Sequence, residues 1–155
     1  MQFSLDEKDL EILILLQPDS TMSNAELSKK LGMAPSAVLE RVKKLEQKGI
    51  IAGYPTRINP IALNLKLLAF IFVKSSSGPG DISLAKHLAD LPEVLELHHI
   101  AGEDCYLLKI RAEDPQSLIQ LMREKFSKLS GILSTKSIIV LETLKETNYL
   151  PIIKD

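Results

Sequence analysis

The spacing of the apolar residues changes near the middle of the chain, and this change limits the folds that the chain can adopt. In the first half, apolar residues recur three or four positions apart, as Leu27 and Leu31 do, which is the period of an amphipathic helix. After Pro60 they gather into short runs such as LLAFIFV at 67–73, a length typical of buried strands. The pattern predicts a helical unit followed by a unit built around a sheet.

The helical half carries the start signals of three helices. Ser4 with Glu7, and Ser23 with Glu26, fit the capping box, in which a hydroxyl accepts the third amide and a carboxylate reaches back to the cap. Pro35 suits the first position of a third helix, because its fixed φ is helical and its missing N–H is not needed there. Three short helices in this order are typical of a helix-turn-helix.

Each predicted helix has an apolar inner face. The expected members are Leu10, Leu13, Ile14 and Leu16 on the first helix, Leu27 and Leu31 on the second, and Val38, Val42 and Leu45 on the third. Gly32 and Gly49 suit the ends of the second and third helices. The segment IIAGYPTRI at 50–58 is expected to form a strand or small hairpin, which would be the wing of a winged helix-turn-helix.

The third helix is the element that a helix-turn-helix places in the DNA major groove. With its valine and leucine stripe inward, a rotation of about 100° per residue turns the opposite face outward. The residues there that suit phosphate contacts are Arg41, Lys43 and Lys44. Those that suit base edges are Ser36, Ala37, against a thymine methyl, and Glu40, accepting from cytosine N4. The alternative is that these charges only solvate an amphipathic helix.

The charge distribution favours double-stranded DNA as a partner. The whole chain carries −1, but residues 27–58 hold seven basic residues against two acidic ones, which is a net charge of +5. The rest of the chain therefore carries about −6. A basic segment on an acidic body is typical of a protein with one surface that meets phosphate.

The second half reads as strands and helices in the order βαββαβ. Strands are expected in the runs LKLLAFIFVK, EVLELHHIA, CYLLKIRA and ILSTKSIIVLET. Helices are expected from Ile82 to Leu91 and from Pro115 to about Leu129, with Asp114 as cap of the second. This order predicts a ferredoxin-like unit, with two helices on one face of a four-stranded antiparallel sheet.

The predicted fold class is α+β, a winged helix-turn-helix followed by a ferredoxin-like effector and dimerisation domain. The expected boundaries are 1–58 for the DNA-binding domain, 59–65 for a hinge at Asn59–Pro60, and 66–155 for the ferredoxin-like domain. The first strand is apolar on both sides, whereas the helices cover one face. A second subunit is expected to cover the other, because exposing an apolar sheet is unfavourable.

Composition points to a protein of the cytoplasm that does not span a membrane. A single cysteine cannot form an internal disulfide. The first residues, MQFSLDEKD, lack the apolar core of a signal peptide, and the most apolar run, IALNLKLLAFIFV, is too short to span a bilayer and is interrupted by Asn64 and Lys66. No cofactor is predicted.

The stretch AGEDCYLLK at 101–109 holds the single cysteine beside two carboxylates. A catalytic cysteine needs a neighbouring cation or a helix N-terminus, so Cys105 is interpreted as a buried strand residue. His98 and His99 are adjacent on a predicted strand and point to opposite faces, which disfavours a shared metal. We predict neither a catalytic nor a metal site here.

Nearly the whole chain, from Leu5 to Leu150, resembles the Lrp/AsnC family, the leucine-responsive and asparagine-linked transcription regulators. The resemblance is carried by LDEKDLEILILLQ, SNAELSKKLGMAPSAVLERVKKLEQKGIIAGY, the INP hinge, AGEDCYLLKIRAED and STKSIIVLETLKETN. It implies a DNA-binding regulator that dimerises through its sheet, assembles to tetramers or octamers, and responds to an amino-acid effector. The ligand-binding residues it implies are Gly102, Glu103, Asp104, Cys105, Tyr106, Thr135 and Ser137.

The sequence departs from the family pattern at three places. The family turn often reads Gly-Asp-aromatic-Asp-Tyr, whereas here it reads Gly-Glu-Asp-Cys-Tyr, so the second acid is replaced by Cys105. Ala34 stands where a capping serine is common, and Glu40 stands where relatives often have a basic residue. Two alternatives stay open: an enzyme resembling haem-pathway decarboxylases of the same plan, and a DNA-architectural protein with no effector.

Overall fold

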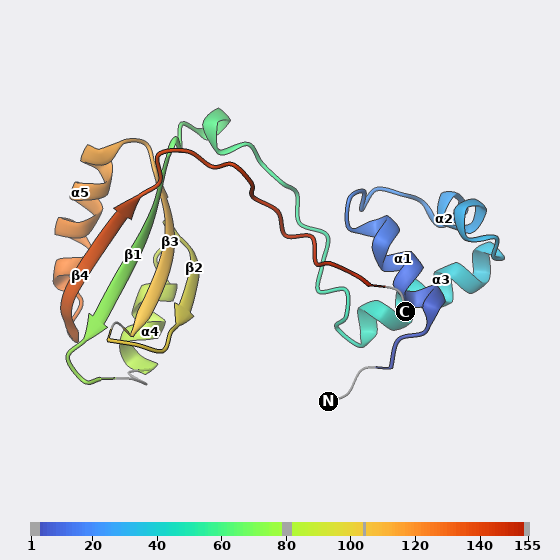
Figure 1. Cartoon of the computed structure of the whole chain (residues 1–155), viewed down its shortest axis with the longest axis horizontal. Coiled ribbons are helices and arrows are strands. Elements are labelled where there is room, and N and C mark those ends of the chain that lie inside the picture. The colour runs from blue at the N-terminus through green and yellow to red at the C-terminus, as the bar shows by residue number, and fades with distance from the viewer. Residues whose placement is uncertain (1–3, 79–81, 104, 154–155) are drawn as a thin grey trace. The chain divides into compact units, whose positions relative to one another are not determined.

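The structure is a computed structural model that describes residues 4–78, 82–103 and 105–153. The chain groups into two compact units, drawn in Figure 1: residues up to Arg57 together with those from Lys145 form one, and Ile58–Leu144 form the other. The first stretch of the helical unit ends at Arg57, one residue before the expected boundary at 58. The C-terminal segment, by contrast, groups with the helices, although the expected boundaries include it in the sheet domain.

Three helices build the first unit: α1 (Glu7–Leu16), α2 (Asn24–Leu31) and α3 (Pro35–Gln47). Its core consists of Ile12, Leu16, Leu27, Leu31, Val38, Val42 and Leu45. The inner faces expected for α2 and α3 are confirmed. On α1 the expectation is wrong for Ile14, which is exposed, and the central buried residue is Ile12.

The helix starts agree with the sequence signals except at α1. Ser23 caps α2 in a full capping box with Glu26, as predicted. The box predicted from Ser4 and Glu7 is wrong, because Asp6 is the cap of α1 and Asp9 is its third residue. Aspartate is as good a cap as serine, and this choice starts α1 two residues later than expected. Ala34, before α3, makes no side-chain cap bond.

The wing predicted at 50–58 does not form a strand or hairpin. All nine positions are described, and none is in a strand. Gly53 and Pro55 explain this result, since glycine weakens strand pairing and proline cannot donate to a ladder. Tyr54 instead donates a hydrogen bond of 2.8 Å from its hydroxyl to Glu46 on α3, which holds the segment against the helix.

The second unit has the predicted βαββαβ order. Its elements are η1 (Pro60–Leu63), β1 (Leu67–Ser75), α4 (Ile82–Ala89), β2 (Val94–His99), β3 (Tyr106–Ala112), α5 (Pro115–Glu124), η2 (Phe126–Lys128) and β4 (Ile132–Ile139). The sheet order is β2-β3-β1-β4, and every paired strand is antiparallel. The predicted fold class, α+β with a ferredoxin-like second unit, is confirmed.

Both helices of this unit pack on one face of the sheet (Figure 1). Leu84 and Leu88 of α4 and Leu118 of α5 share a core with Ile71 and Leu108 of the central strands. The opposite face of β1 presents Phe70 and Phe72, which are half-buried. One face of the sheet is therefore a completed core and the other is left without a helical cover among the described residues.

Side chains of the helical unit hold the C-terminal segment through hydrogen bonds to its backbone. The Gln17 side chain accepts the Leu150 amide at 2.6 Å and donates to the Leu150 carbonyl at 3.1 Å. Arg57 donates to the Glu146 carbonyl at 3.0 Å. The helical unit is therefore assembled from both ends of the described chain. None of the described helices has the length and apolar character that crossing a membrane requires.

Candidate functional site

The exposed face of α3 carries the residues predicted to meet DNA. Packing of Val38, Val42 and Leu45 into the core fixes which side of α3 faces outward. Of the predicted set, the exposed residues are Ser36, Glu40, Lys43 and Lys44, and the half-buried ones are Ala37 and Arg41. The helical period thus brings all six onto the outer side of α3 or its border, as the sequence predicts.

Glu40 and Lys44 form an ion pair one turn apart on this face. The Lys44 ammonium lies 2.7 Å from Oε1 of Glu40, and the side chains are 61% and 68% exposed respectively. The hydrogen bond from Lys44 lowers the pKa of Glu40 from its ordinary value. Such exposed pairs within a helix are weak and are readily exchanged for other partners, so both groups remain available to DNA.

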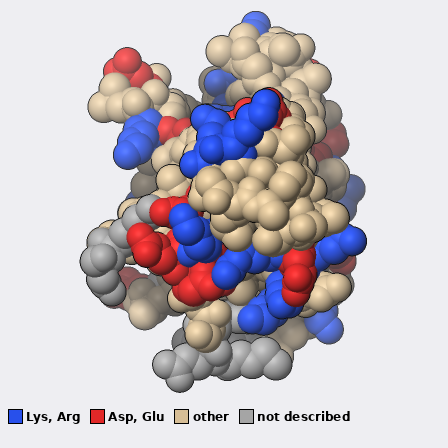
Figure 2. Space-filling model, turned by 90° about the vertical axis from the view of Figure 1, so that its right-hand side faces the viewer, with Lys and Arg blue, Asp and Glu red and all other residues tan. Residues whose placement is uncertain are grey.

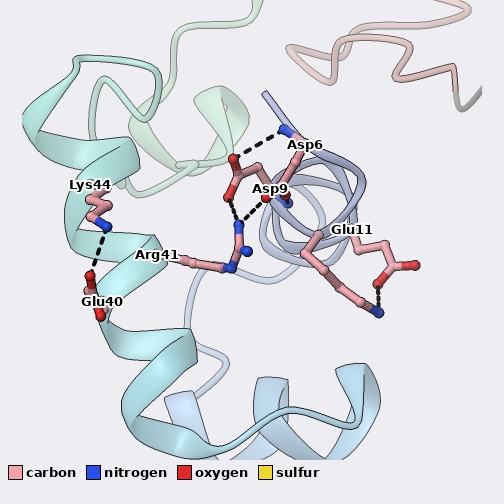
Figure 3. A network of polar contacts seen from close by, with 7 residues as sticks. Asp6, Asp9, Glu11, Glu40, Arg41 and Lys44 are labelled. Atoms are coloured by element: carbon pink, nitrogen blue, oxygen red, sulfur yellow. Dashed lines mark hydrogen bonds and ion pairs between the residues drawn. The ribbon is translucent and has the colours of Figure 1, made fainter. Parts of the chain in front are cut away.

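Arg41 makes a different kind of contact. Its Nη1 lies 2.6 Å from Oδ2 of Asp6 and 2.8 Å from Oδ1 of Asp9, so it joins α3 to the start of α1, as Figure 3 shows. Hydrogen bonds to Asp6 first, and then to Asp9, raise the pKa of the guanidinium above its ordinary value. The pKa of Asp6 is lowered, first by the amide of Asp9 and then by Arg41.

The acidic residues of α1 and the predicted DNA-facing residues border one groove. This groove, with a volume of about 440 Å³, is lined in part by Asp6, Asp9, Ala37, Glu40, Arg41 and Lys44. Figure 2 shows basic side chains in several groups separated by acidic ones, rather than as one continuous basic face. The groove beside α3 is itself lined by side chains of both charges.

Sequence reasoning missed two contacts of α3. The first is the Arg41 contact with Asp6 and Asp9. The spacing Asp-x-x-Asp before an apolar run signals the cap of α1 but not this contact. The second is the bond from Tyr54 to Glu46. Burial first, and then this hydrogen bond, raise the pKa of Tyr54 to about 12. No spacing rule links a tyrosine in an extended segment to a helix eight residues before it.

The predicted effector turn follows β2 and leads into β3. Gly102 has a φ of 134°, a backbone conformation that favours glycine, and Glu103 is exposed. Asp104 lies outside the described residues. Cys105, 5% exposed, and Tyr106 are buried in the sheet core.

The sheet register brings part of the predicted ligand set together. Val73 on β1 pairs with Tyr106 on one side and Thr135 on the other, so the turn and Thr135 lie at the same end of the sheet. The amide of Cys105 donates to the Val73 carbonyl at 3.0 Å. Ser137 lies two residues further along β4, opposite Ile71. The two hydroxyl residues are exposed, whereas the Cys105 side chain faces the core.

The two histidines occupy opposite faces, as predicted. His98 pairs with Leu107 and His99 with Tyr106 in the β2–β3 register. His98 lies 3.3 Å from Glu96, whereas the His99 ring lies 5.4 Å from the Tyr106 ring. Within the described part of the chain, no three histidine, cysteine or acidic side chains are grouped so as to hold a metal ion.

Comparisons with known proteins match both units. Residues 68–150 match the Lrp/AsnC ligand binding domain, and residues 5–52 match a winged helix-turn-helix DNA-binding domain. The leucine-responsive regulatory protein of Escherichia coli K12 is 38% identical over 150 residues, covering 96% of this chain and 92% of that protein. That of Klebsiella pneumoniae is 37% identical with the same coverage.

Solved structures agree with the sequence relatives. The complex of the Neisseria meningitidis transcriptional regulator NMB0573 with L-methionine has a TM-score of 0.90 at 32% identity and covers 96% of this chain and 97% of that chain. Escherichia coli AsnC has a TM-score of 0.90 at 28% identity and covers 96% of this chain and all of that chain (100%). The predicted family is thereby confirmed. With its helix-turn-helix unit and its ligand-binding unit, the chain belongs to the Lrp/AsnC family of transcription regulators.

Proposed function

We propose that α3 enters the major groove of its operator and reads it with Ser36, Ala37 and Glu40, while Lys43 and Lys44 hold phosphates. The observation that carries this proposal is the exposed face of α3, where a hydroxyl, a methyl, a carboxylate and two ammonium groups are presented together. These groups match the base-edge and phosphate partners of a recognition helix. A dimer would present this face twice, which suits a palindromic operator.

The sheet unit is proposed to bind an amino-acid effector at the end of the sheet where the 102–106 turn meets Thr135. The related regulator from Neisseria meningitidis was solved with L-methionine, which supports this ligand class. Thr135 and Ser137 supply exposed hydroxyl groups on β4, and Gly102 and Glu103 are exposed on the turn. Cys105 and Tyr106 are buried in the sheet core, so we propose that they support the turn by packing in that core.

The open face of the sheet is proposed to pair with a second copy of the chain. Phe70 lies between Ile138 and Lys109 in the register, and Phe72 lies between Lys136 and Leu107. The Lys136 ammonium lies 5.5 Å from the Phe72 ring centre. Covering these aromatic and aliphatic side chains removes apolar area from water. We also propose further assembly to tetramers or octamers and a cytoplasmic location, as the membership of the Lrp/AsnC family suggests.

A thermal-shift screen of the purified protein against the common amino acids tests the effector proposal. A ligand that binds the folded state raises the melting temperature by mass action, by an amount that corresponds to about 2.7 kcal/mol at a hundredfold excess over Kd. We expect a shift with one or a few amino acids. Thr135→Val should abolish the shift, whereas Ser134→Ala, whose side chain points to the opposite face of β4, should keep it.

Other outcomes of this screen favour the alternative functions. If no amino acid shifts the melting temperature while the protein still binds DNA, the effector proposal is wrong and an effector-free architectural role is favoured. Soret absorbance in the purified protein would reveal a bound tetrapyrrole and would favour the decarboxylase-like enzyme. A response that survives Thr135→Val would place the effector elsewhere.

A further inference from the structure

Arg41 is the residue of α3 whose contacts differ most from those expected of a phosphate-binding side chain. Its side chain is 32% exposed and that of Asp9 is 17% exposed, so their contact is partly shielded from water. The Glu40–Lys44 pair joins two exposed residues of a single helix, whereas Arg41 joins α3 to α1. The Arg41 contact therefore bears on how the two helices are arranged.

Each of the two aspartates uses one carboxylate oxygen for the cap of α1 and the other for Arg41. Asp6 accepts the Asp9 amide through Oδ1 at 2.9 Å and Arg41 through Oδ2. Asp9 accepts the Asp6 amide through Oδ2 at 3.3 Å and Arg41 through Oδ1. Each carboxylate thus caps α1 with one oxygen and holds the guanidinium with the other (Figure 3). The first turn of α1 and the Arg41 side chain are fixed by the same two groups.

Charge also disfavours the release of Arg41 to a phosphate. The cluster holds one guanidinium and two carboxylates, so the departure of Arg41 would leave two anions without their cation beside the approaching DNA. They would lie in the groove that Ala37 and Glu40 also line. Like charges close together are unfavourable in a partly shielded site. By contrast, if Lys44 moves to a phosphate, only one carboxylate, that of the exposed Glu40, loses its partner.

We propose that Arg41 is a positioning residue. Held by Asp6 and Asp9, it sets the orientation of α3 against α1 and thereby the placement of Ser36, Ala37 and Glu40 on the base edges, and it does not itself contact phosphate. This inference rests on the proposed reading of DNA by α3. It gives Arg41 a different role from the phosphate contact expected from the sequence.

The test compares two DNA fragments, one selected by the wild-type protein from a random pool and one of unrelated sequence. Affinities are measured by fluorescence anisotropy with the full chain, as wild type, Arg41→Gln, Asp9→Asn and the double variant. Asparagine at position 9 keeps an oxygen that can accept the Asp6 amide, so the cap of α1 is retained while the charge is removed. Circular dichroism establishes that each variant is folded at the temperature of the assay.

The ratio of the two affinities is the decisive quantity, because a long-range charge effect acts on both fragments equally and cancels. Each single variant should lower this ratio by about 2- to 150-fold, the range that corresponds to the coupling of contacting residues. The double variant should lower it no further, since either change already breaks the link. Arg41→Lys, which keeps the charge, should retain part of the discrimination.

A phosphate contact predicts the opposite pattern. Arg41→Gln would then weaken both fragments equally and leave the ratio unchanged, and Asp9→Asn would tighten both by freeing the guanidinium. An unchanged ratio in both single variants overturns the positioning role, because a change that is equal for the two fragments can arise from charge alone. Lys43→Ala, measured on the same fragments, separates this failure from a wider one: if it too has no effect on either fragment, the proposed DNA contacts of α3 are wrong.

Discussion

Replacing Lys43 by alanine should change how strongly DNA binding depends on salt. Lys43 is exposed on α3, and the ion pairs found on this helix involve Arg41 and Lys44 instead. Each lysine that neutralises a phosphate adds about −0.9 to the slope of log K against log salt. A dimer presents α3 twice, so Lys43→Ala should make this slope less negative by about 1.8.

The magnitude is large enough to measure by anisotropy titration. Over a fourfold rise in salt, from about 50 to about 200 mM, a slope difference of about 1.8 changes the ratio of wild-type to variant affinity by about 12-fold. The advantage of the wild type should therefore shrink as salt rises, on selected and unrelated fragments alike. Lys86→Ala, which removes the same charge from an exposed position on α4, is the matched control and should keep the wild-type slope. Equal slopes for Lys43→Ala and wild type would refute the phosphate contact.

Three further predictions concern the helical unit. Ala34→Ser should stabilise it by about 0.5–1 kcal/mol in urea denaturation, because α3 lacks a side-chain cap, whereas Ala52→Ser in the exposed extended segment should have little effect. Gln17→Ala should speed hydrogen exchange of the Leu150 amide, which it accepts at 2.6 Å; unchanged exchange would mean that the tail is held by other groups. The Tyr54 pKa is raised from 10.0 to about 12, so the stability that this group contributes is present below about pH 10 and lost as the pH rises through about 12. The ultraviolet difference titration between wild type and Tyr54→Phe should have its midpoint near 12, and a midpoint near 10 would contradict the burial of Tyr54 together with its bond to Glu46.

The fold was largely predictable because its signals are local. Apolar spacing separates the helical unit from the sheet unit, and Ser23 with Glu26, Pro35 and Asp114 mark helix starts within a few residues. The predicted wing does not form, and the reason again lies in residues of the segment itself. The 50–58 segment holds isoleucines typical of a strand, yet Gly53 and Pro55 within it oppose pairing. No described residue of the helical unit is in a strand that could pair with it.

The contacts of the DNA-binding face were less predictable because their partners lie far away in sequence. Helical period places Arg41 at the border of the exposed face, but it cannot show that Asp6, 35 residues earlier, meets the guanidinium. A basic residue on a recognition helix favours a phosphate contact by default. Only the packing of α1 against α3 reveals a competing carboxylate pair.

The effector turn shows the same limit at shorter range. Its location between β2 and β3 followed from the hairpin pattern, and burial of Cys105 agrees with its interpretation as a core residue. That Thr135 shares the end of the sheet with the turn depends on the β1–β4 register. Register between strands some sixty residues apart is a property of the assembled sheet, since no single run of residues encodes it.

The hydrogen bonds between Gln17 and Leu150 have a consequence for synthesis on the ribosome. A chain emerges from its N-terminus, so α1, α2 and α3 are exposed well before the segment from Lys145 that completes their unit. The whole ferredoxin-like sheet is translated in between. Until the sheet domain has emerged, the helices are therefore present in the nascent chain without the contact to Leu150. A nascent chain stalled before Lys145 would contain every core residue of the helix-turn-helix but would lack the hydrogen bonds from Gln17 and Arg57 to the C-terminal segment.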